Sequence, residues 1–159
     1  MGSALYVVDT ATLLTIQNER SDASECFDGM TDLVQESRLC FSAEVVEELG
    51  RLARGEQALV WAKAVAASRC NKGAPYSFTS WVLESCSGLV DETALATQEP
   101  AAPFVAAQAV QIRAEDNEVF VVTEDIREKP TRLCLRQACE QLDLPSMRLE
   151  EFLEDTNLP

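Results

Sequence analysis

Acidic and hydroxyl side chains follow two apolar runs of the sequence, and these residue types in these places could do chemistry. Asp9 and Thr10 end the first run, and Thr123 and Asp125 follow the second. Short apolar runs rich in β-branched residues are typical of strands buried in a parallel sheet. Because ligands of open α/β sheets bind at the carboxyl ends of the strands, both aspartates are candidate site residues. The alternative for Asp9 or Thr10 is that it caps the following helix.

A third acid, Glu48, lies at the edge of the apolar stripe of a helix expected over 43–54. An unpaired charge in that position is costly unless a cation meets it. The alternative is a partly solvated glutamate that pairs with Arg51 or Arg54. If the sheet is parallel, Glu48 starts from the same edge as the two aspartates, and three carboxylates without histidine or cysteine suit Mg²⁺ or Mn²⁺. Such an ion polarises a phosphoryl oxygen and activates water.

The apolar pattern predicts the elements that would position these acids. Strands are expected at 5–8, 39–41, 118–123 and 147–149. Helices are expected at 13–16, 26–37, 43–54, 56–69, 78–86, 103–114, 132–142 and 150–154. Strands that alternate with helices are typical of the βαβ units of a doubly wound sheet. The length of 159 residues indicates a single domain over residues 1–159.

The balance of charge limits the partners. With 13 basic and 27 acidic residues, the net charge of −14 argues against broad, sequence-blind binding of nucleic acid. A local basic patch or a metal ion could overcome this charge, and Arg127, Lys129, Arg132 and Arg136 follow Asp125 closely enough to supply such a patch. Alternatively, these side chains are solvated and pair with nearby glutamates. The absence of histidine excludes Ser-His-Asp and Cys-His nucleophile systems.

Cysteine usage and hydropathy bear on location. The six cysteines form no CxxC motif, and no histidine is present to complete a zinc site, so we expect reduced, mostly buried thiols. No apolar run reaches the ~18 residues of a membrane span, and the chain has no signal-like start. These features favour a cytoplasmic protein that does not bind membranes.

The order and spacing of several motifs resemble those of PIN domains, the family that includes the VapC-type toxins, along nearly the whole chain. The motifs are Tyr6-Val7-Val8-Asp9-Thr10, Ser42-Ala43-Glu44-Val45-Val46-Glu47-Glu48-Leu49, Gly88-Leu89-Val90-Asp91, Pro103-Phe104-Val105-Ala106-Ala107-Gln108-Ala109, Val121-Val122-Thr123-Glu124-Asp125 and Arg148-Leu149-Glu150-Glu151-Phe152-Leu153. The resemblance implies a three-layer α/β/α fold with a mostly parallel central sheet of four to five strands. It also implies a ribonuclease dependent on Mg²⁺ or Mn²⁺ that acts on single-stranded RNA as the toxin of a toxin–antitoxin pair.

The resemblance assigns roles to individual positions. Asp9, Glu48 and Asp125 would be the catalytic acids that hold the metal, and Thr123 would help to orient the site. Substrate contacts are expected from Thr10 and Thr123, and, because of the basic patch after Asp125, from Arg127 and Lys129. A cognate antitoxin protein and a homodimer are also compatible with the family.

One acid of the family pattern is missing. PIN domains usually place an aspartate before the Pro-Phe pair that opens a helix, whereas this chain has Ala102 before Pro103. The substitution removes a helix cap and a metal ligand, and Glu99 is a candidate substitute. Two functions therefore stay open: the metal-dependent ribonuclease, and a catalytically lapsed PIN-like fold that binds protein or RNA as a regulatory module.

Other doubly wound folds agree less well with the first strand and its turn. Haloacid-dehalogenase-like phosphatases need a second aspartate where this chain has Ala11. Response-regulator receivers need an acidic pair at the first strand, where Val8 precedes Asp9. Dinucleotide-binding folds need a glycine-rich turn after the first strand, and this turn contains no glycine.

Overall fold

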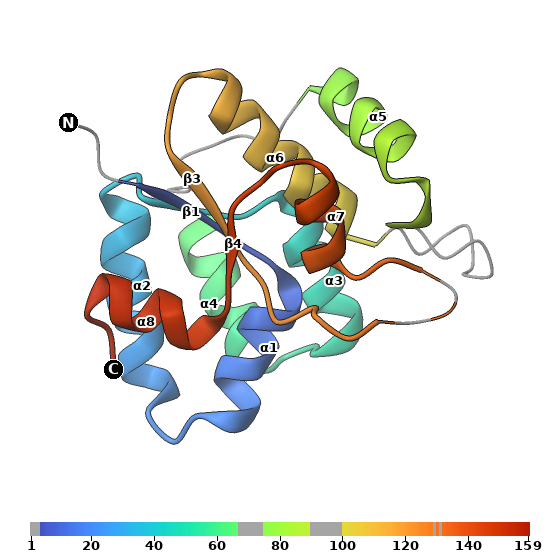
Figure 1. Cartoon of the computed structure of the whole chain (residues 1–159). Helices are drawn as coiled ribbons and strands as arrows, with labels where there is room; N and C mark the ends of the chain where they lie inside the picture. The colour runs from blue at the N-terminus through green and yellow to red at the C-terminus, as the bar shows by residue number, and fades with distance from the viewer. Residues whose placement is uncertain (1–3, 67–74, 90–99, 129, 131) are drawn as a thin grey trace.

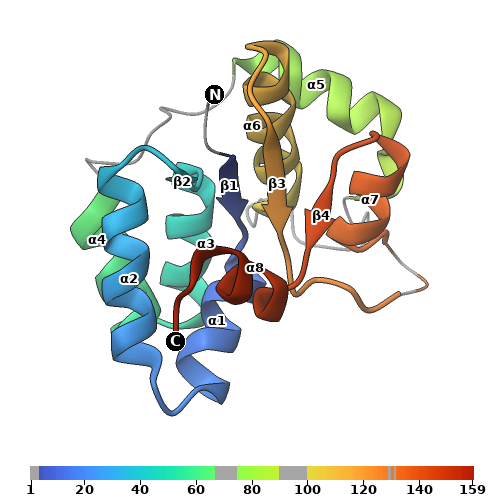
Figure 2. The same ribbon diagram turned by 60° about the vertical axis from the view of Figure 1, so that its left-hand side comes forward.

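A parallel sheet forms the centre of the computed structural model, which describes residues 4–66, 75–89, 100–128, 130 and 132–159. Its strands are β1 (Leu5–Val8), β2 (Leu39–Cys40), β3 (Val119–Val122) and β4 (Ser146–Met147). All four run parallel in the order β2-β1-β3-β4, and Figure 2 shows β1, β3 and β4 side by side. The predicted α/β class and its parallel sheet are confirmed.

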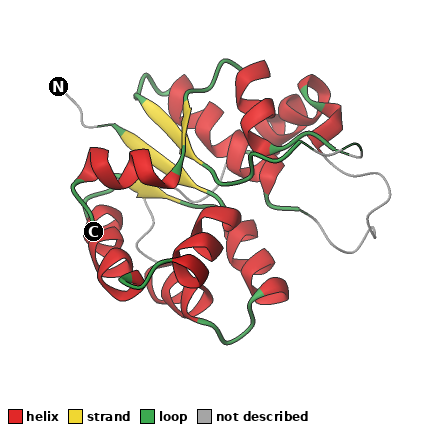
Figure 3. Cartoon of the chain, turned by 60° about the horizontal axis from the view of Figure 1, so that its bottom comes forward, coloured by secondary structure: helices red, strands yellow, loops and turns green. Residues whose placement is uncertain are grey.

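Helices cover the sheet on both faces, as expected for three layers. They are α1 (Thr10–Glu19), α2 (Ala23–Gln35), α3 (Ala43–Leu52), α4 (Gln57–Val65), α5 (Tyr76–Ser85), α6 (Ala102–Ala114), α7 (Leu135–Gln141) and α8 (Leu149–Thr156), with a 3₁₀ turn at Ser87–Leu89. Figures 1 and 3 show that α8 lies against one face of the sheet and that α6 lies against the opposite face. The carboxyl ends of the strands lead into the turns that carry the predicted acids.

The two central strands form the core because their side chains are apolar on both faces. Val7 of β1 pairs in register with Val121 of β3, and both are fully buried. Tyr6 packs edge-on against Phe152 of α8, with 5.1 Å between the ring centroids. Full burial of an apolar side chain such as that of Phe152 contributes roughly 1.5–3 kcal/mol to the free energy of unfolding. The burial holds the ends of β1 and β3 in fixed positions.

Most helix starts differ from the predicted ones. α1 and α2 each begin three residues earlier than expected, at Thr10 and Ala23, whereas α4 begins one residue later and α5 two residues earlier. The starts of α6, α7 and α8 have a common cause. α6 begins at Ala102 with Ala101 as its N-cap, one residue earlier than expected. α7 begins at Leu135 rather than at residue 132, and α8 begins at Leu149, which was assigned to a strand. In each case a carboxylate from elsewhere in the chain accepts a backbone N–H at or near the helix start, at Ala101, Leu135 or Leu149. Such long-range contacts leave no local sequence pattern.

The prediction that the cysteines are reduced is correct only in part. Cys26, Cys86, Cys134 and Cys139 are free and buried. Cys40 is disulfide-bonded, so the prediction is wrong for this residue. Sequence spacing alone does not reveal which cysteines a fold brings together. In the part of the chain that the structure describes, no helix has both the length and the apolar character needed to span a membrane.

Candidate functional site

A cleft of about 900 Å³ opens at the carboxyl ends of the strands. The three acids that the sequence singled out, Asp9, Glu48 and Asp125, all line it. Its other charged residues are Glu19, Glu124, Arg127, Arg132 and Arg148. Residues from distant parts of the chain meet here because parallel strands end at the same edge of the sheet.

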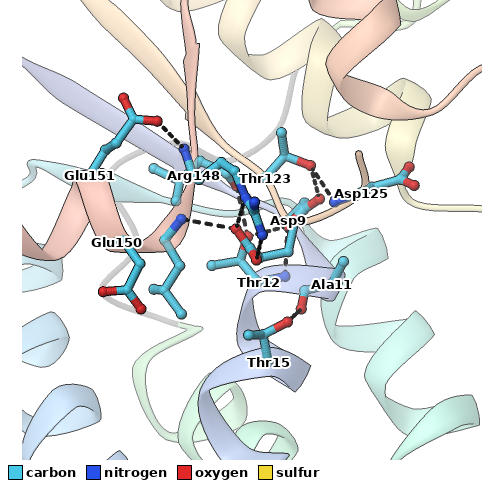
Figure 4. Close-up of polar contacts among 12 residues, drawn as sticks. Asp9, Ala11, Thr12, Thr15, Thr123, Asp125, Arg148, Glu150 and Glu151 are labelled. Carbon is cyan, nitrogen blue, oxygen red and sulfur yellow. Dashed lines mark hydrogen bonds and ion pairs between the residues drawn. The ribbon is translucent and has the colours of Figure 1, made fainter. Parts of the chain in front are cut away.

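Asp9 both caps a helix and lines the cleft, so the capping interpretation is confirmed, and the role of this residue in a functional site stays a prediction. It is the N-cap of α1, and its Oδ1 accepts the backbone N–H of Thr12 over 2.8 Å and the Thr12 hydroxyl over 2.6 Å. Its Oδ2 accepts the hydroxyl of Thr123 over 2.5 Å, as Figure 4 shows. The residue is 4% exposed. Hydrogen bonds from α1 and from the end of β3 therefore hold its carboxylate in one orientation.

Burial changes the acidity of Asp9. Removal from water raises the pKa of its carboxyl to about 6, and the nearby charge of Asp125 acts in the same direction. Hydrogen bonds from Thr12 and Thr123 favour the charged form and oppose this rise. Asp9 is thus ionised at neutral pH but takes up a proton in mildly acidic solution.

Asp125 has a partner that the sequence did not predict. Both of its carboxylate oxygens accept hydrogen bonds from Arg132, over 3.1 and 3.3 Å. The N–H of Leu135, at the start of α7, donates to Oδ2 over 3.0 Å. Figure 4 shows this carboxylate pointing away from that of Asp9. Asp125 lines the predicted site, but here it binds a guanidinium group and the end of a helix.

Glu48 connects α3 to the start of α6. Its Oε2 accepts the N–H of Ala101 over 3.1 Å. The ion pair with Arg51 that we considered is present at 3.9 Å. Glu48 therefore places a negative charge at the N-terminus of α6, where the helix dipole favours it.

Glu124 and Arg148 are site residues that the sequence analysis missed. The carboxylate of Glu124 accepts hydrogen bonds from Nε and Nη2 of Arg148, over 3.1 and 2.8 Å, and from the N–H of Leu149 over 3.0 Å. Burial of Glu124 acts to raise its pKa, but these hydrogen bonds and the charge of Arg148 outweigh burial and lower it. The position of Arg148 directly after β4, at the carboxyl edge of the sheet, was the signal that could have identified it.

The expected substrate contacts lie in different environments. Arg127 is exposed on the cleft. Thr10 also lines it, but its Oγ1 is buried and has no hydrogen-bond partner among the described residues. Thr123 is 1% exposed, and its hydroxyl donates to Asp9 and accepts the N–H of Asp125 over 2.9 Å. Thr123 thus orients Asp9 from below the surface, and in this arrangement its hydroxyl does not face the cleft.

Some of the remaining predicted site residues line the cleft, and others lie elsewhere or outside the residues that the structure describes. Ala102, at the position where the PIN pattern usually has an aspartate, lines the cleft. Arg132 lines it as well, whereas Arg136 is not among the cleft residues. Glu99 and Lys129 lie outside the described residues.

The cleft contains oxygen donors of the kind that hard divalent cations prefer. Within the described residues, no group of three histidine, cysteine, aspartate or glutamate side chains is arranged to hold a metal ion. Mg²⁺, however, usually binds proteins through one or two carboxylates, together with water and substrate phosphates. Arginine holds both oxygens of Glu124 and of Asp125, whereas the hydrogen bonds that Asp9 accepts from the described residues all come from uncharged donors. Asp9 and Glu48 are therefore the predicted ligands whose carboxylates are not held in a bidentate arginine pair.

Comparison with known proteins does not assign a family. No protein-family model matches the sequence, and no curated protein matches it. The resemblance to PIN domains therefore rests on the motifs, and the activity that it implies is a proposal.

Proposed function

We propose that the chain is a PIN-like endoribonuclease dependent on Mg²⁺ or Mn²⁺, with the cleft as its active site and single-stranded RNA as its substrate. The observation that carries the proposal is that Asp9, Glu48 and Asp125 line one cleft at the carboxyl edge of a parallel sheet. These acids come from three separate parts of the chain, and the sequence pattern predicts all three. In this proposal the protein partner is a cognate antitoxin, as the resemblance implies.

The charges of the cleft support a cation-dependent activity. Five acidic residues line the cleft against three arginines. An acidic surface repels the phosphodiester backbone, and the net charge of −14 adds to this repulsion. A divalent ion between carboxylate and phosphate would remove the repulsion, which makes metal and RNA binding interdependent.

In this proposal the residues in and around the cleft have three roles: metal binding, orientation of a metal ligand, and contact with RNA. Asp9 and Glu48 would hold the ion, which supplies polarisation of a phosphoryl oxygen and a lowered pKa of water. Thr12 and Thr123 keep the Asp9 carboxylate oriented, and their hydrogen bonds favour its ionised form. Arg127, exposed on the cleft, would meet the RNA backbone.

A second candidate is a PIN-like binding module that has lost hydrolysis. Two observations favour it: Ala102 stands on the cleft in place of an acid, and Arg132 occupies both oxygens of Asp125. Such a protein would bind RNA or another protein at the cleft without cleaving it. The two candidates differ in whether a divalent ion causes cleavage.

A cleavage assay separates these functions. Purified protein is incubated with end-labelled single-stranded RNA in Mn²⁺, in Mg²⁺ or in EDTA. Glu19→Gln is the matched control for Asp9→Asn, since it removes one negative charge from the same cleft. We expect cleavage that needs metal, survives Glu19→Gln and is lost in Asp9→Asn. RNA that is bound but never cleaved would overturn the nuclease and favour the binding module.

A further inference from the structure

Glu124 and Arg148 form a fixed unit on the cleft wall. The two carboxylate oxygens of Glu124 accept hydrogen bonds from Nε and Nη2 of Arg148. The side chain of Glu124 is 12% exposed. The same carboxylate accepts the N–H of Leu149, so the first residue of α8 is held to the end of β3. An arginine bound in this way has little freedom to leave the cleft.

Asp125, the next residue, repeats the arrangement with a second arginine. Its carboxylate accepts hydrogen bonds from Nη1 and Nη2 of Arg132 and from the N–H of Leu135 at the start of α7. The Asp125 side chain is 15% exposed. Two neighbouring acids after β3 therefore each hold one guanidinium group and one helix end, and both arginines line the same cleft.

The held arginines keep hydrogen-bond donors for a ligand. A guanidinium group carries five N–H donors in a planar fork. Within the described residues, Nη1 of Arg148 and Nε of Arg132 have no acceptor. The side chains of Arg148 and Arg132 are 48% and 23% exposed, so solvent reaches both. Planar N–H forks of this kind match the oxygens of a phosphate group.

We propose that Arg132 and Arg148 form a phosphate clamp for the backbone of single-stranded RNA, and that Glu124 and Asp125 are the positioning residues that hold its two guanidinium groups. The nature of the ligand rests on the proposed function, but the clamp itself does not require hydrolysis. It also gives Asp125 a role different from the metal ligand that the sequence suggested. Prior ordering of both arginines reduces the conformational entropy lost when a phosphate binds.

RNA binding tests the clamp separately from cleavage. The affinity for a fluorescent 2′-O-methyl oligonucleotide is measured by anisotropy at several salt concentrations in Mg²⁺. Arg148→Ala and Arg132→Ala should each weaken binding about tenfold and lower the salt slope by about one, since each removes a phosphate contact. Arg148→Lys should keep the slope and lose affinity, because lysine lacks the planar fork. Arg54→Ala, an exposed arginine outside the cleft, is the control for lost charge.

The positioning role makes a prediction of opposite sign to simple electrostatics. Glu124→Gln removes a negative charge from the cleft, which by charge alone should tighten RNA binding. If Glu124 positions Arg148, the variant should instead bind RNA several-fold more weakly, while Glu19→Gln binds as tightly as wild type or more tightly. Melting curves confirm that each variant is folded.

The outcomes distinguish the clamp from the nuclease. Weaker binding by the arginine variants, without RNA cleavage by the wild type, would retain the clamp and reject the nuclease. Wild-type affinity and salt slope in both Arg148→Ala and Arg132→Ala would overturn the clamp, whatever the cleavage assay shows. A wild-type protein that binds no RNA would overturn it as well.

Discussion

The hydroxyl of Thr123 donates a hydrogen bond to Oδ2 of Asp9 over 2.5 Å, although 114 residues separate them in the chain. The same hydroxyl accepts the N–H of Asp125 over 2.9 Å. One side chain thus connects the end of β3 to the carboxylate that follows β1. Because hydrogen bonds to a carboxylate favour its charged form, the acidity of Asp9 depends on this contact.

Replacement of Thr123 should make Asp9 a weaker acid. Thr123→Val removes the donor to Oδ2, and we expect the pKa of Asp9 to rise above its present value of about 6. Thr123→Ser keeps the hydroxyl and should leave the pKa near 6. NMR titration of the aspartate side-chain carboxyl carbons measures both. Identical titration of Asp9 in wild type and Thr123→Val would show that this hydrogen bond does not control its charge.

The raised pKa of Asp9 predicts how stability depends on pH. Burial raises this pKa from 3.8 to about 6, so between these values the folded state holds a proton that the unfolded state releases. The free energy of unfolding contributed by Asp9 therefore falls as pH rises from about 4 to about 6, with a total on the order of 3 kcal/mol.

Asp9→Asn isolates this contribution. The variant should match wild type at pH 4, where Asp9 is protonated, and become progressively more stable than wild type as pH rises to 7. Urea unfolding at a series of pH values measures the difference between the two proteins. A constant difference across the series, or a variant that is less stable at pH 7, would contradict a desolvated charge at this position.

The sequence predicted the acids that directly follow buried strands, and it did not predict the partners that those acids bind. Asp9 and Asp125 were found because each follows a strongly apolar run, and the end of such a strand has a known position in a parallel sheet. The pairing of Arg148 with Glu124 spans 24 residues. No periodicity encodes such a distance, and Arg148 was placed within a strand. Helix starts at Leu135 and Leu149 depend on these same long-range contacts, which explains why their predicted boundaries were wrong.

Introducing an aspartate at residue 102 should stabilise the protein most when metal is present. Ala102 is the first residue of α6 and lines the cleft. An aspartate there would meet the positive end of the helix dipole, contributing about 0.3–1 kcal/mol, and would add a carboxylate to the site. Ala102→Asp should therefore raise the melting temperature more with Mn²⁺ than without it. Ala102→Asn, of similar size but uncharged, should show no such difference. Equal shifts for the two variants with and without Mn²⁺ would mean that residue 102 does not contribute to a metal site.

Glu48 should have two separable effects, one on helix α6 and one on metal. Glu48→Ala removes the acceptor for the N–H of Ala101 and should lower the free energy of unfolding by ~0.5–1.5 kcal/mol, the usual net contribution of one hydrogen bond. Glu48→Gln keeps an acceptor oxygen and should lose less stability, yet both variants should bind Mn²⁺ more weakly. Thermal unfolding and calorimetric titration measure the two effects. If Glu48→Gln binds Mn²⁺ as tightly as wild type, Glu48 only supports the start of α6 and is not a metal ligand.

Direct titration with Mn²⁺ tests the proposed active site most directly. Isothermal titration calorimetry at pH 7 compares the wild-type protein with Asp9→Asn, and with Glu19→Gln as the matched change elsewhere in the cleft. We predict that wild type and Glu19→Gln bind Mn²⁺ and that Asp9→Asn, although folded, loses at least tenfold in affinity, because Asp9 is the buried carboxylate that arginine does not hold. Absence of Mn²⁺ binding by the wild type, or equal affinity in Asp9→Asn, would contradict a metal-dependent ribonuclease in this cleft.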